Sequence, residues 1–300
     1  MFMRTISSPF GCASRHTPPG DVLMWSLFTA AAALASLVLV LIAAFLLGEA
    51  APLVSDGGMT RFFTDPGWWP KDQSFNLVPM LASSLLLTTG ATLLATPFAV
   101  GLAVFVVFMG PRWLTTPMRR LVEASAAVPT VVYGLWGAST IVPLLNTIEA
   151  PGASLLAGII VLALMITPTI TILSREALQA VPSSFVQASS ALGVSRARTL
   201  VHVVLPAAWP GICASLVLGA ARAIGETMAV LMVCGNIVQI PGSLFDPVRA
   251  LTANIALEMP YAMGAHRASL FMGGFMVLML VTALVMVREG IVRERQGAST

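Results

Sequence analysis

Charged side chains are scarce in this sequence. Aspartate, glutamate, lysine and arginine together make up only 10% of the 300 residues, whereas a typical soluble domain carries about 25%. Hydrophobic residues make up 57% of the chain. So few charges cannot cover a globular surface, but an apolar chain can face lipid without cost. The composition therefore indicates an integral membrane protein, and a net charge of only +3 gives no argument for nucleic-acid binding.

Lysine is nearly absent, and this excludes nucleotide hydrolysis by the chain itself. A phosphate-binding P-loop needs a glycine-rich turn followed by lysine and then serine or threonine. The only lysine is Lys71, which lies between Pro70 and Asp72. An ATP-driven process that involves this chain therefore requires an ATPase on another subunit.

Cysteine and histidine are too few and too scattered to form a metal centre. The three cysteines are Cys12, Cys213 and Cys234, and no pair has the short spacing of metal ligands. No paired aspartates, serine–histidine pair or HExxH-type spacing lies in the apolar stretches. We therefore expect no catalytic residue, no metal and no cofactor, and we interpret the cysteines as small packing residues.

Long apolar runs, in contrast, are abundant. A membrane-spanning helix needs about 20 mostly apolar residues, and six stretches meet this requirement. They are residues 25–47, 79–108, 124–145, 153–173, 211–233 and 268–287. The first is longer than the roughly 7–15-residue core of a secretory signal, so we interpret it as a retained helix. The predicted fold class is an all-α polytopic membrane protein with about six transmembrane helices.

Basic residues are distributed unequally between the two sides of these spans. With the N-terminus in the cytoplasm, the four outer ones are Arg61, Lys71, Arg249 and Arg267. The eleven inner ones are Arg4, Arg15, Arg112, Arg119, Arg120, Arg175, Arg196, Arg198, Arg288, Arg293 and Arg295. Cytoplasmic loops carry the excess of basic residues, so both termini are predicted to be cytoplasmic. The expected organisation is an N-terminal segment with the first span and an outer loop (1–78), a transmembrane domain (79–287) and a cytoplasmic tail (288–300).

A long polar loop separates the fourth and fifth spans on the inner side. Residues 174–210 carry a partial helical stripe and are too polar to span a membrane. Ser184 and Gln187 fit a capping box, in which the serine caps a helix and the glutamine bonds back to it. We expect this short helix to end at Gly193, a residue suited to a left-handed helix end, and a second short helix to stop before Pro206. By composition alone, a helix on the membrane surface and a helix that docks on a partner protein are equally consistent with this loop.

The same loop resembles a known family motif. Residues 187–193 read Q-A-S-S-A-L-G, and V-V-L-P follows after nine further residues. This is similar to the coupling loop of binding-protein-dependent ABC importer permeases, whose pattern is E-A-A-x-x-x-G, nine residues, I-x-L-P. The matching residues are Ala188, Gly193, Leu205 and Pro206. Gln187 stands where the family usually has glutamate. The resemblance covers residues 79–287 and implies that the loop docks in a cleft of a cytoplasmic ATPase subunit.

Two charged residues lie in the middle of the fifth apolar stretch. Arg222 and Glu226 are four residues apart, so on a continuous helix they share one face. A charge at the bilayer centre costs about 2.5–3.5 kcal/mol on insertion scales, and such residues usually line a pathway. The alternative is a structural ion pair that locks two helices together. Gly219 and Gly225 favour the pathway, because small residues leave room for a ligand or for a close helix crossing.

This stretch carries a second resemblance. Residues 222–230 read R-A-I-G-E-T-M-A-V, and residues 128–137 read V-P-T-V-V-Y-G-L-W-G. Together they resemble phosphate-specific ABC permeases of the PstC type, and the G-E-T core is shared with the sister PstA type. The resemblance implies that Arg222, Glu226 and Thr227 lie on a phosphate pathway. From the residues alone, the tyrosine and tryptophan of the other motif are also consistent with simple packing.

The resemblance also implies an assembly and a location. The chain is expected to form one half of a heterodimeric channel in the cytoplasmic (inner) membrane, paired with a PstA-type permease subunit. Two PstB-type ATPase subunits and a periplasmic phosphate-binding protein of the PstS type complete the expected importer. Two alternatives stay open at this point. One is a permease of the same family for sulfate or molybdate, and the other is a secondary transporter or channel, which needs no coupling loop.

Overall fold

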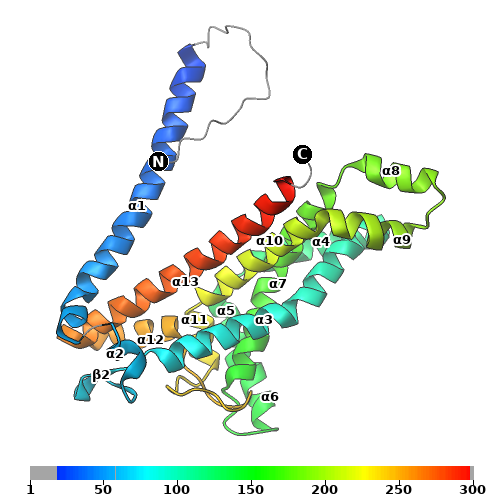
Figure 1. The fold of residues 1–300 in the computed structure, drawn as a ribbon. Helices are drawn as coiled ribbons and strands as arrows, with labels where there is room; N and C mark the ends of the chain where they lie inside the picture. Colours follow the sequence, from blue (N-terminus) through cyan, green and yellow to red (C-terminus); the bar gives the residue numbers. More distant parts are fainter. Residues whose placement is uncertain (1–18, 58, 298–300) are drawn as a thin grey trace. The chain divides into compact units, whose positions relative to one another are not determined.

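The computed structural model describes residues 19–57 and 59–297, and the chain forms two compact units (Figure 1). One unit ends at Phe45 and the other begins at Leu46. In the first unit, the described residues belong to helix α1 (Pro19–Gly57), and every side chain from residue 23 to residue 42 is exposed. This unit buries none of these apolar side chains by itself, as expected of a helix that faces lipid or another chain.

The second unit contains the end of α1 and all the described elements that follow it. Its long helices are α3 (Val78–Val104), α4 (Arg112–Ala126), α7 (Leu155–Gln179), α10 (Leu205–Ile224) and α13 (Gly264–Gly297). Its short helices are α2 (Arg61–Thr64), α5 (Thr130–Trp136), α6 (Val142–Asn146), α8 (Ser183–Ala191), α9 (Arg196–Thr199), α11 (Met228–Val233) and α12 (Leu251–Glu258).

Smaller elements connect these helices. Wide π-helical turns are η2 (Phe105–Met109), η3 (Gly137–Ile141) and η4 (Leu200–Val204), and 3-10 turns are η1 (Pro70–Asp72) and η5 (Met259–Tyr261). Strands β1 (Trp68–Trp69) and β2 (Ser74–Phe75) pair in an antiparallel hairpin. Within the second unit, α8 and α9 lie at the end opposite to α2 and α12 (Figure 1).

The helices confirm the predicted fold class. Those long and apolar enough to cross a membrane are Leu23–Leu53, Val78–Met109, Leu155–Gln179, Arg196–Ile224 and Gly264–Gly290. The pair Arg112–Ala126 and Thr130–Asn146 passes the same test together, and as one bent span it supplies a sixth. Four spans therefore fall where the sequence predicts apolar helices, the span Arg196–Ile224 overlaps its predicted stretch only in part, and the sixth differs in shape.

The predicted span at residues 124–145 is not one continuous helix, because the chain bends by 95° between α4 and α5. Pro129 immediately precedes α5. Proline lacks an amide hydrogen and disfavours a helical conformation in the residue before it, so α4 ends just upstream. The hydroxyl of Tyr133 donates to the carbonyl oxygen of Ser125 at 2.9 Å and ties the two sides of the corner together. Tyr133 therefore has a structural role.

The predicted span at residues 211–233 is also interrupted. α10 ends at Ile224, and α11 starts only at Met228. Gly225 directly follows α10, and glycine is one of the least favourable residues in a helix interior. Arg222 therefore lies in the last turn of a helix, next to a break in the backbone, and not in the middle of a continuous span.

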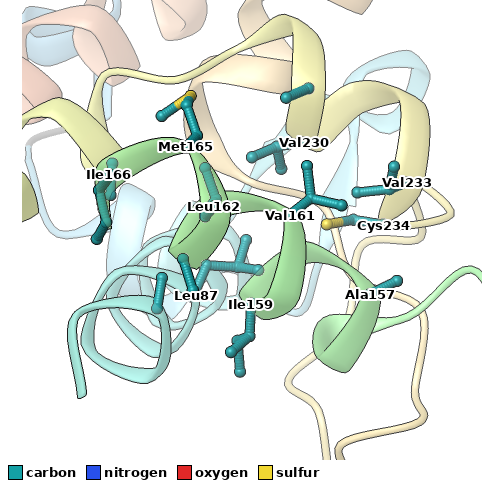
Figure 2. Close-up of a cluster of buried hydrophobic side chains, with 14 of the residues drawn as sticks. Leu87, Ala157, Ile159, Val161, Leu162, Met165, Ile166, Val230, Val233 and Cys234 are labelled. Carbon is teal, nitrogen blue, oxygen red and sulfur yellow. The ribbon is translucent and has the colours of Figure 1, made fainter. Parts of the chain in front are cut away.

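The largest buried cluster lies where α7 contacts both α3 and α11 (Figure 2). Its labelled side chains are Leu87, Ala157, Ile159, Val161, Leu162, Met165, Ile166, Val230, Val233 and Cys234. A Cβ atom at Gly158 would lie 2.4 Å from the Cys234 sulfur and 2.5 Å from Leu87 Cδ2, so glycine is required for this close approach. Cys234 is fully buried in the cluster and serves as a packing residue, as predicted.

α7 packs against α10 through a ladder of small residues. A Cβ atom at Gly211 would lie 2.5 Å from an alanine side chain of α7. One turn further along α10, Ser215 Oγ and Ser174 Oγ share a buried hydrogen bond of 2.8 Å. Another turn on, a Cβ atom at Gly219 would lie 2.7 Å from Ile170 Cγ1. Small residues four apart let two membrane helices approach closely, so the close helix crossing, one of the two roles expected for Gly219, is observed.

A polar network holds α12 at one end of this unit. The carboxylate of Glu258 accepts hydrogen bonds from Trp68 Nε1 at 2.8 Å and from Arg249 Nη1 at 2.7 Å. His266 Nε2 lies 2.8 Å from the same carboxylate. The network therefore joins the hairpin, α12 and α13. It anchors α12, which contacts the segment that follows α10.

α5 packs on α11 with no room for a side chain at Gly134. A Cβ atom there would lie 2.8 Å from Ala229 Cα, a backbone atom that cannot rotate away. Gly137 belongs to the same sequence motif as Gly134, residues 128–137. A Cβ atom at Gly137 would lie 2.5 Å from Val161 Cγ2 on α7. These two glycines therefore let α5 and η3 pack closely on α11 and α7.

Replacing Gly134 with alanine should destabilise the folded protein by about 1–3 kcal/mol, because the added methyl group forces the α11 backbone to move. Gly101 is the matched control, since it lies in α3 with no neighbouring atom within 4 Å of its missing Cβ. Gly101→Ala should be neutral or stabilising by up to about 1 kcal/mol. Thermal unfolding of the purified protein in detergent measures both changes. Equal stability of the two variants would contradict the packing described.

Candidate functional site

Among the residues that the structure describes, none supplies an acidic partner for the positive charge of Arg222. Its side chain is exposed in the isolated chain, and its Nη1 lies 3.5 Å from Thr169 Oγ1 on α7, the outer limit of a hydrogen bond. Among residues 19–57 and 59–297, no carboxylate oxygen lies within 4 Å of this guanidinium. The charge is therefore held beside a neutral hydroxyl group, which leaves it available to an anion.

Glu226 lies beyond the end of α10, so the prediction that it shares a helix face with Arg222 is wrong. Its side chain is only 9% exposed, and its Oε1 accepts a hydrogen bond from the Ala229 amide at 3.2 Å. Its backbone carbonyl oxygen accepts a hydrogen bond from Thr252 Oγ1 of α12 at 2.8 Å. Glu226 therefore satisfies an amide in the first turn of α11, where a negative charge is favourable, and it binds α12.

Thr227 immediately precedes α11 and is half-buried. Its carbonyl oxygen accepts from the Leu231 amide at 2.9 Å, which is the first hydrogen bond in the series of α11. Its Oγ1 lies 3.5 Å from the Gly225 carbonyl oxygen. Together with Arg222 and Glu226, Thr227 lies at the break between α10 and α11, so all three residues expected on a pathway belong to one short non-helical turn and its flanks.

The second region of interest is the loop of α8 and α9. α8 begins at Ser183 with Pro182 as its N-cap, and no side chain caps it. The predicted capping box between Ser184 and Gln187 is therefore wrong. Pro182 sets the start of the helix because its extended backbone and fixed φ end the preceding turn, which places Ser184 inside the first turn.

Gly193 ends α8 as predicted. It has a φ of 73°, a left-handed conformation that strains any residue with a Cβ atom. Its amide donates to the Ser190 carbonyl oxygen at 3.0 Å, and the Val194 amide donates to the Ser189 carbonyl oxygen at 3.1 Å. This pair of bonds is the Schellman motif, which satisfies carbonyl groups left over at a helix end.

One face of α8 is tethered and the other is open. Ser189 Oγ and Thr199 Oγ1 share a buried hydrogen bond of 2.8 Å, which ties α8 to α9. Ala188 and Leu192 line a surface groove of about 630 Å³, and Leu192 is 82% exposed. Gln187 is also exposed. α8 is therefore tied to α9 through Ser189, while the apolar side chains of Ala188 and Leu192 stay accessible to a partner.

The second predicted short helix does not stop before Pro206. α9, η4 and α10 run on as one helical stretch, Arg196–Ile224. Pro206 stands in the first turn of α10, where a missing amide hydrogen is tolerated, and the wider π-helical turn of η4 makes room for its ring. Leu205 is half-buried against the apolar cluster at this end of α10.

This helical stretch joins the two regions. Thr199 in the loop and Arg222 at the break are 23 residues apart, which corresponds to roughly 35 Å along a helix. α7 enters the same loop from the other side and carries Thr169 beside Arg222. The loop and the guanidinium are therefore linked by two helices that pack closely on each other.

Hydroxyl side chains are the residues that sequence reasoning missed. Thr169 beside Arg222, the pair Ser174 and Ser215, and the pair Ser189 and Thr199 all make contacts between different elements. Small polar residues in apolar helices are their only signal, and most such hydroxyls bond to their own helix. The sequence therefore does not separate these residues from the rest.

Comparisons with known proteins identify the family of the chain. Residues 95–294 match the family described as "Binding-protein-dependent transport system inner membrane component". The chain is 30% identical over 299 residues to the phosphate transport system permease protein PstC of Haemophilus influenzae, which covers 90% of this chain and 94% of that protein. It is 37% identical over 211 residues to the probable ABC transporter permease protein YqgH of Bacillus subtilis, covering 69% and 68% respectively.

Solved structures share the fold. A bacterial alginate ABC transporter in complex with an alginate pentasaccharide-bound periplasmic protein matches with a TM-score of 0.63 at 14% identity, over 92% of this chain and 96% of that chain. The MetNI methionine ABC transporter in an inward-facing conformation matches with a TM-score of 0.59 at 19% identity, over 73% and 95%. At these identities the likeness concerns the fold alone.

The Glu226 carboxylate should be required for stability at the break. Glu226→Ala leaves the buried Ala229 amide without its acceptor and should cost about 1–3 kcal/mol. Glu226→Gln keeps a side-chain oxygen at the same place and should retain most of that stability. The midpoint of thermal unfolding, measured for both variants, separates the two cases. A Glu226→Ala protein as stable as the unmodified chain would show that this hydrogen bond contributes nothing.

Proposed function

Because the chain belongs to the family of binding-protein-dependent transport system inner-membrane components, we propose that it passes inorganic phosphate through the membrane as one half of an importer channel. As an ABC importer permease, it is a multi-pass inner-membrane protein that works with an ATPase and a periplasmic binding protein. ATP hydrolysis belongs to a separate subunit, in agreement with a chain whose single lysine, Lys71, has no P-loop around it.

The observation that carries the phosphate proposal is the guanidinium of Arg222, which has a hydroxyl neighbour and no carboxylate within 4 Å among the described residues. Phosphate is anionic at neutral pH, so crossing hydrocarbon without a counter-charge is prohibitive, and a fixed cation lowers that barrier. The curated relatives at about 30% identity over about 90% of the chain are named as phosphate permeases. Glu226 and Thr227 flank the same break, and the acidic charge limits how tightly an anion is held, which favours its release.

The finer partners are proposed by analogy with those relatives. They are a PstA-type permease subunit, two PstB-type ATPase subunits and a PstS-type phosphate-binding protein. The open face of α8 supports the ATPase contact, since Ala188 and Leu192 form an exposed apolar knob. In this proposal, α8 docks on the ATPase, Gly193 sets the path of the chain behind it, and Leu205 with Pro206 starts the helix that leads to Arg222.

A permease for another oxyanion is the remaining alternative. A permease for sulfate or molybdate needs the same coupling loop and the same positive charge. An arginine alone does not distinguish these anions from phosphate. Membership of the importer family excludes the alternative that the chain is a secondary transporter or channel. Uptake of labelled phosphate by the complete complex, with sulfate and molybdate as competitors, decides between the oxyanions: competition by sulfate at equal concentration would assign the chain to sulfate.

The proposed topology has both termini in the cytoplasm, because basic residues are in excess on that side. A membrane-impermeant thiol reagent should label cysteines placed at Ser55 and Ser243 in intact cells, and it should not label Cys12. Ser243 is exposed in the loop before α12. The unmodified chain is the control for background labelling. Outside labelling of Cys12, which lies outside the described residues, would reverse the orientation.

Gly193→Val should leave membrane insertion intact but uncouple ATP hydrolysis from transport. A β-branched residue in the left-handed conformation at the end of α8 costs roughly 1–2 kcal/mol and redirects the chain that follows. Gln187→Glu on the exposed face is the matched control and should transport normally. ATPase rate and phosphate uptake are measured on the same reconstituted complex. Normal transport by Gly193→Val would show that the conformation of this loop is not required for coupling.

Arg222→Gln should abolish phosphate uptake while the complex still assembles, because the pathway loses its cation. Arg222→Lys should restore only part of the rate, since a lysine keeps the charge but loses the planar fork that grips two oxygens. Membrane abundance and uptake are measured for Arg222→Gln, for Glu226→Gln and for the double variant. If Arg222 and Glu226 were only a structural ion pair, the double variant would recover both abundance and uptake, and that recovery would refute the pathway role.

A further inference from the structure

Three threonines, Thr167, Thr169 and Thr171, lie at every second position of α7 around Pro168, and their hydroxyl groups make different contacts. Thr167 Oγ1 donates to the Ala163 carbonyl oxygen at 2.7 Å, and Thr171 Oγ1 donates to the Thr167 carbonyl oxygen at 2.8 Å, each one turn back along the same helix. Thr169, between them, instead lies 3.5 Å from Nη1 of Arg222 on α10. It is the hydroxyl of the three that faces the charge at the break.

The chemistry of its partner decides how the Thr169 hydroxyl is used. A guanidinium group has five N–H donors and no acceptor, so the oxygen of Thr169 accepts in this contact. A hydroxyl group that accepts still has its own proton to donate. The Thr169 proton is therefore available beside a positive charge, which is the arrangement that an oxyanion with several acceptor oxygens binds.

Packing holds this pair of groups in place. Gly219, three residues before Arg222, lies against Ile170, the residue after Thr169, so closely that a Cβ atom would come within 2.7 Å. The buried hydrogen bond between Ser174 and Ser215 holds α7 and α10 together further along the same interface. The helix segments that carry Arg222 and Thr169 are therefore held close together, so that both donors reach one anion.

We propose that Thr169 is a second ligand of the translocated oxyanion. Arg222 supplies the charge and binds one or two oxygens, while the Thr169 hydroxyl donates a hydrogen bond to another oxygen of the same anion. The contact between Arg222 and Thr169 is long, so an anion oxygen replaces it with little loss. This inference rests on the proposed role of Arg222 and extends the binding site from α10 to α7. It also places the anion between the two helices that enter the coupling loop from opposite sides.

The test uses the complete transporter reconstituted in lipid vesicles with its partner subunits and binding protein. Thr169→Val removes the hydroxyl group at nearly constant volume, and a lost hydrogen bond to a charged ligand corresponds to about a tenfold or larger drop in the phosphate uptake rate. Thr169→Ser keeps the hydroxyl group and should restore most of the rate. Thr167→Val is the matched control, because that hydroxyl is already bonded within α7, and it should transport at the unmodified rate.

Two results would overturn the proposal. One is normal uptake by Thr169→Val in a complex that Arg222→Gln inactivates. The other is a loss in Thr169→Val that Thr169→Ser does not restore, since this would assign the effect to side-chain shape. The phosphate assignment is tested separately by the unmodified complex. If that complex imports sulfate or molybdate and not phosphate, the phosphate assignment fails, and the same three variants then test Thr169 with the imported oxyanion.

Discussion

The close approach of α7 and α10 is the contact on which the candidate site depends. Gly211 and Gly219 remove side-chain volume between the two helices, and the hydrogen bond from Ser215 to Ser174 joins them between these glycines. In lipid, where no water competes, such packing and such buried bonds are what holds helices together. The same two helices carry Arg222 and Thr169 at one level and enter the α8–α9 loop at another, so the proposed anion site and the loop share one closely packed support.

The break after α10 determines which groups Arg222 and Glu226 contact. A continuous helix would have paired Arg222 with the carboxylate one turn on and neutralised its charge. Because the helix ends at Ile224, Glu226 instead accepts the Ala229 amide, and the guanidinium is left beside a hydroxyl group. An unneutralised cation in a membrane span is expensive, and the proposed passage of an anion gives a reason to retain it.

The sequence alone predicts the structural features that depend on local composition. The apolar runs predict the spans, and Gly193 predicts the end of α8, because both signals lie in the residues concerned. The bend before Pro129 and the break after α10 were missed, since an apolar run does not reveal where its helix stops. The partner of Thr169 lies 53 residues away, and only the tertiary packing of α7 on α10 makes that hydroxyl differ from Thr167 and Thr171.

The central claim is that α7 and α10 act as one unit between the loop and the anion site. Cysteines at Ser174 and Ser215, whose oxygens lie 2.8 Å apart, allow these helices to be cross-linked and released in the reconstituted complex. We predict that the oxidised double variant imports phosphate at about the rate of the reduced one, because the link fixes a distance that does not change during transport. Uptake that stops on oxidation and returns on reduction would show that the two helices must slide past each other, which contradicts this account.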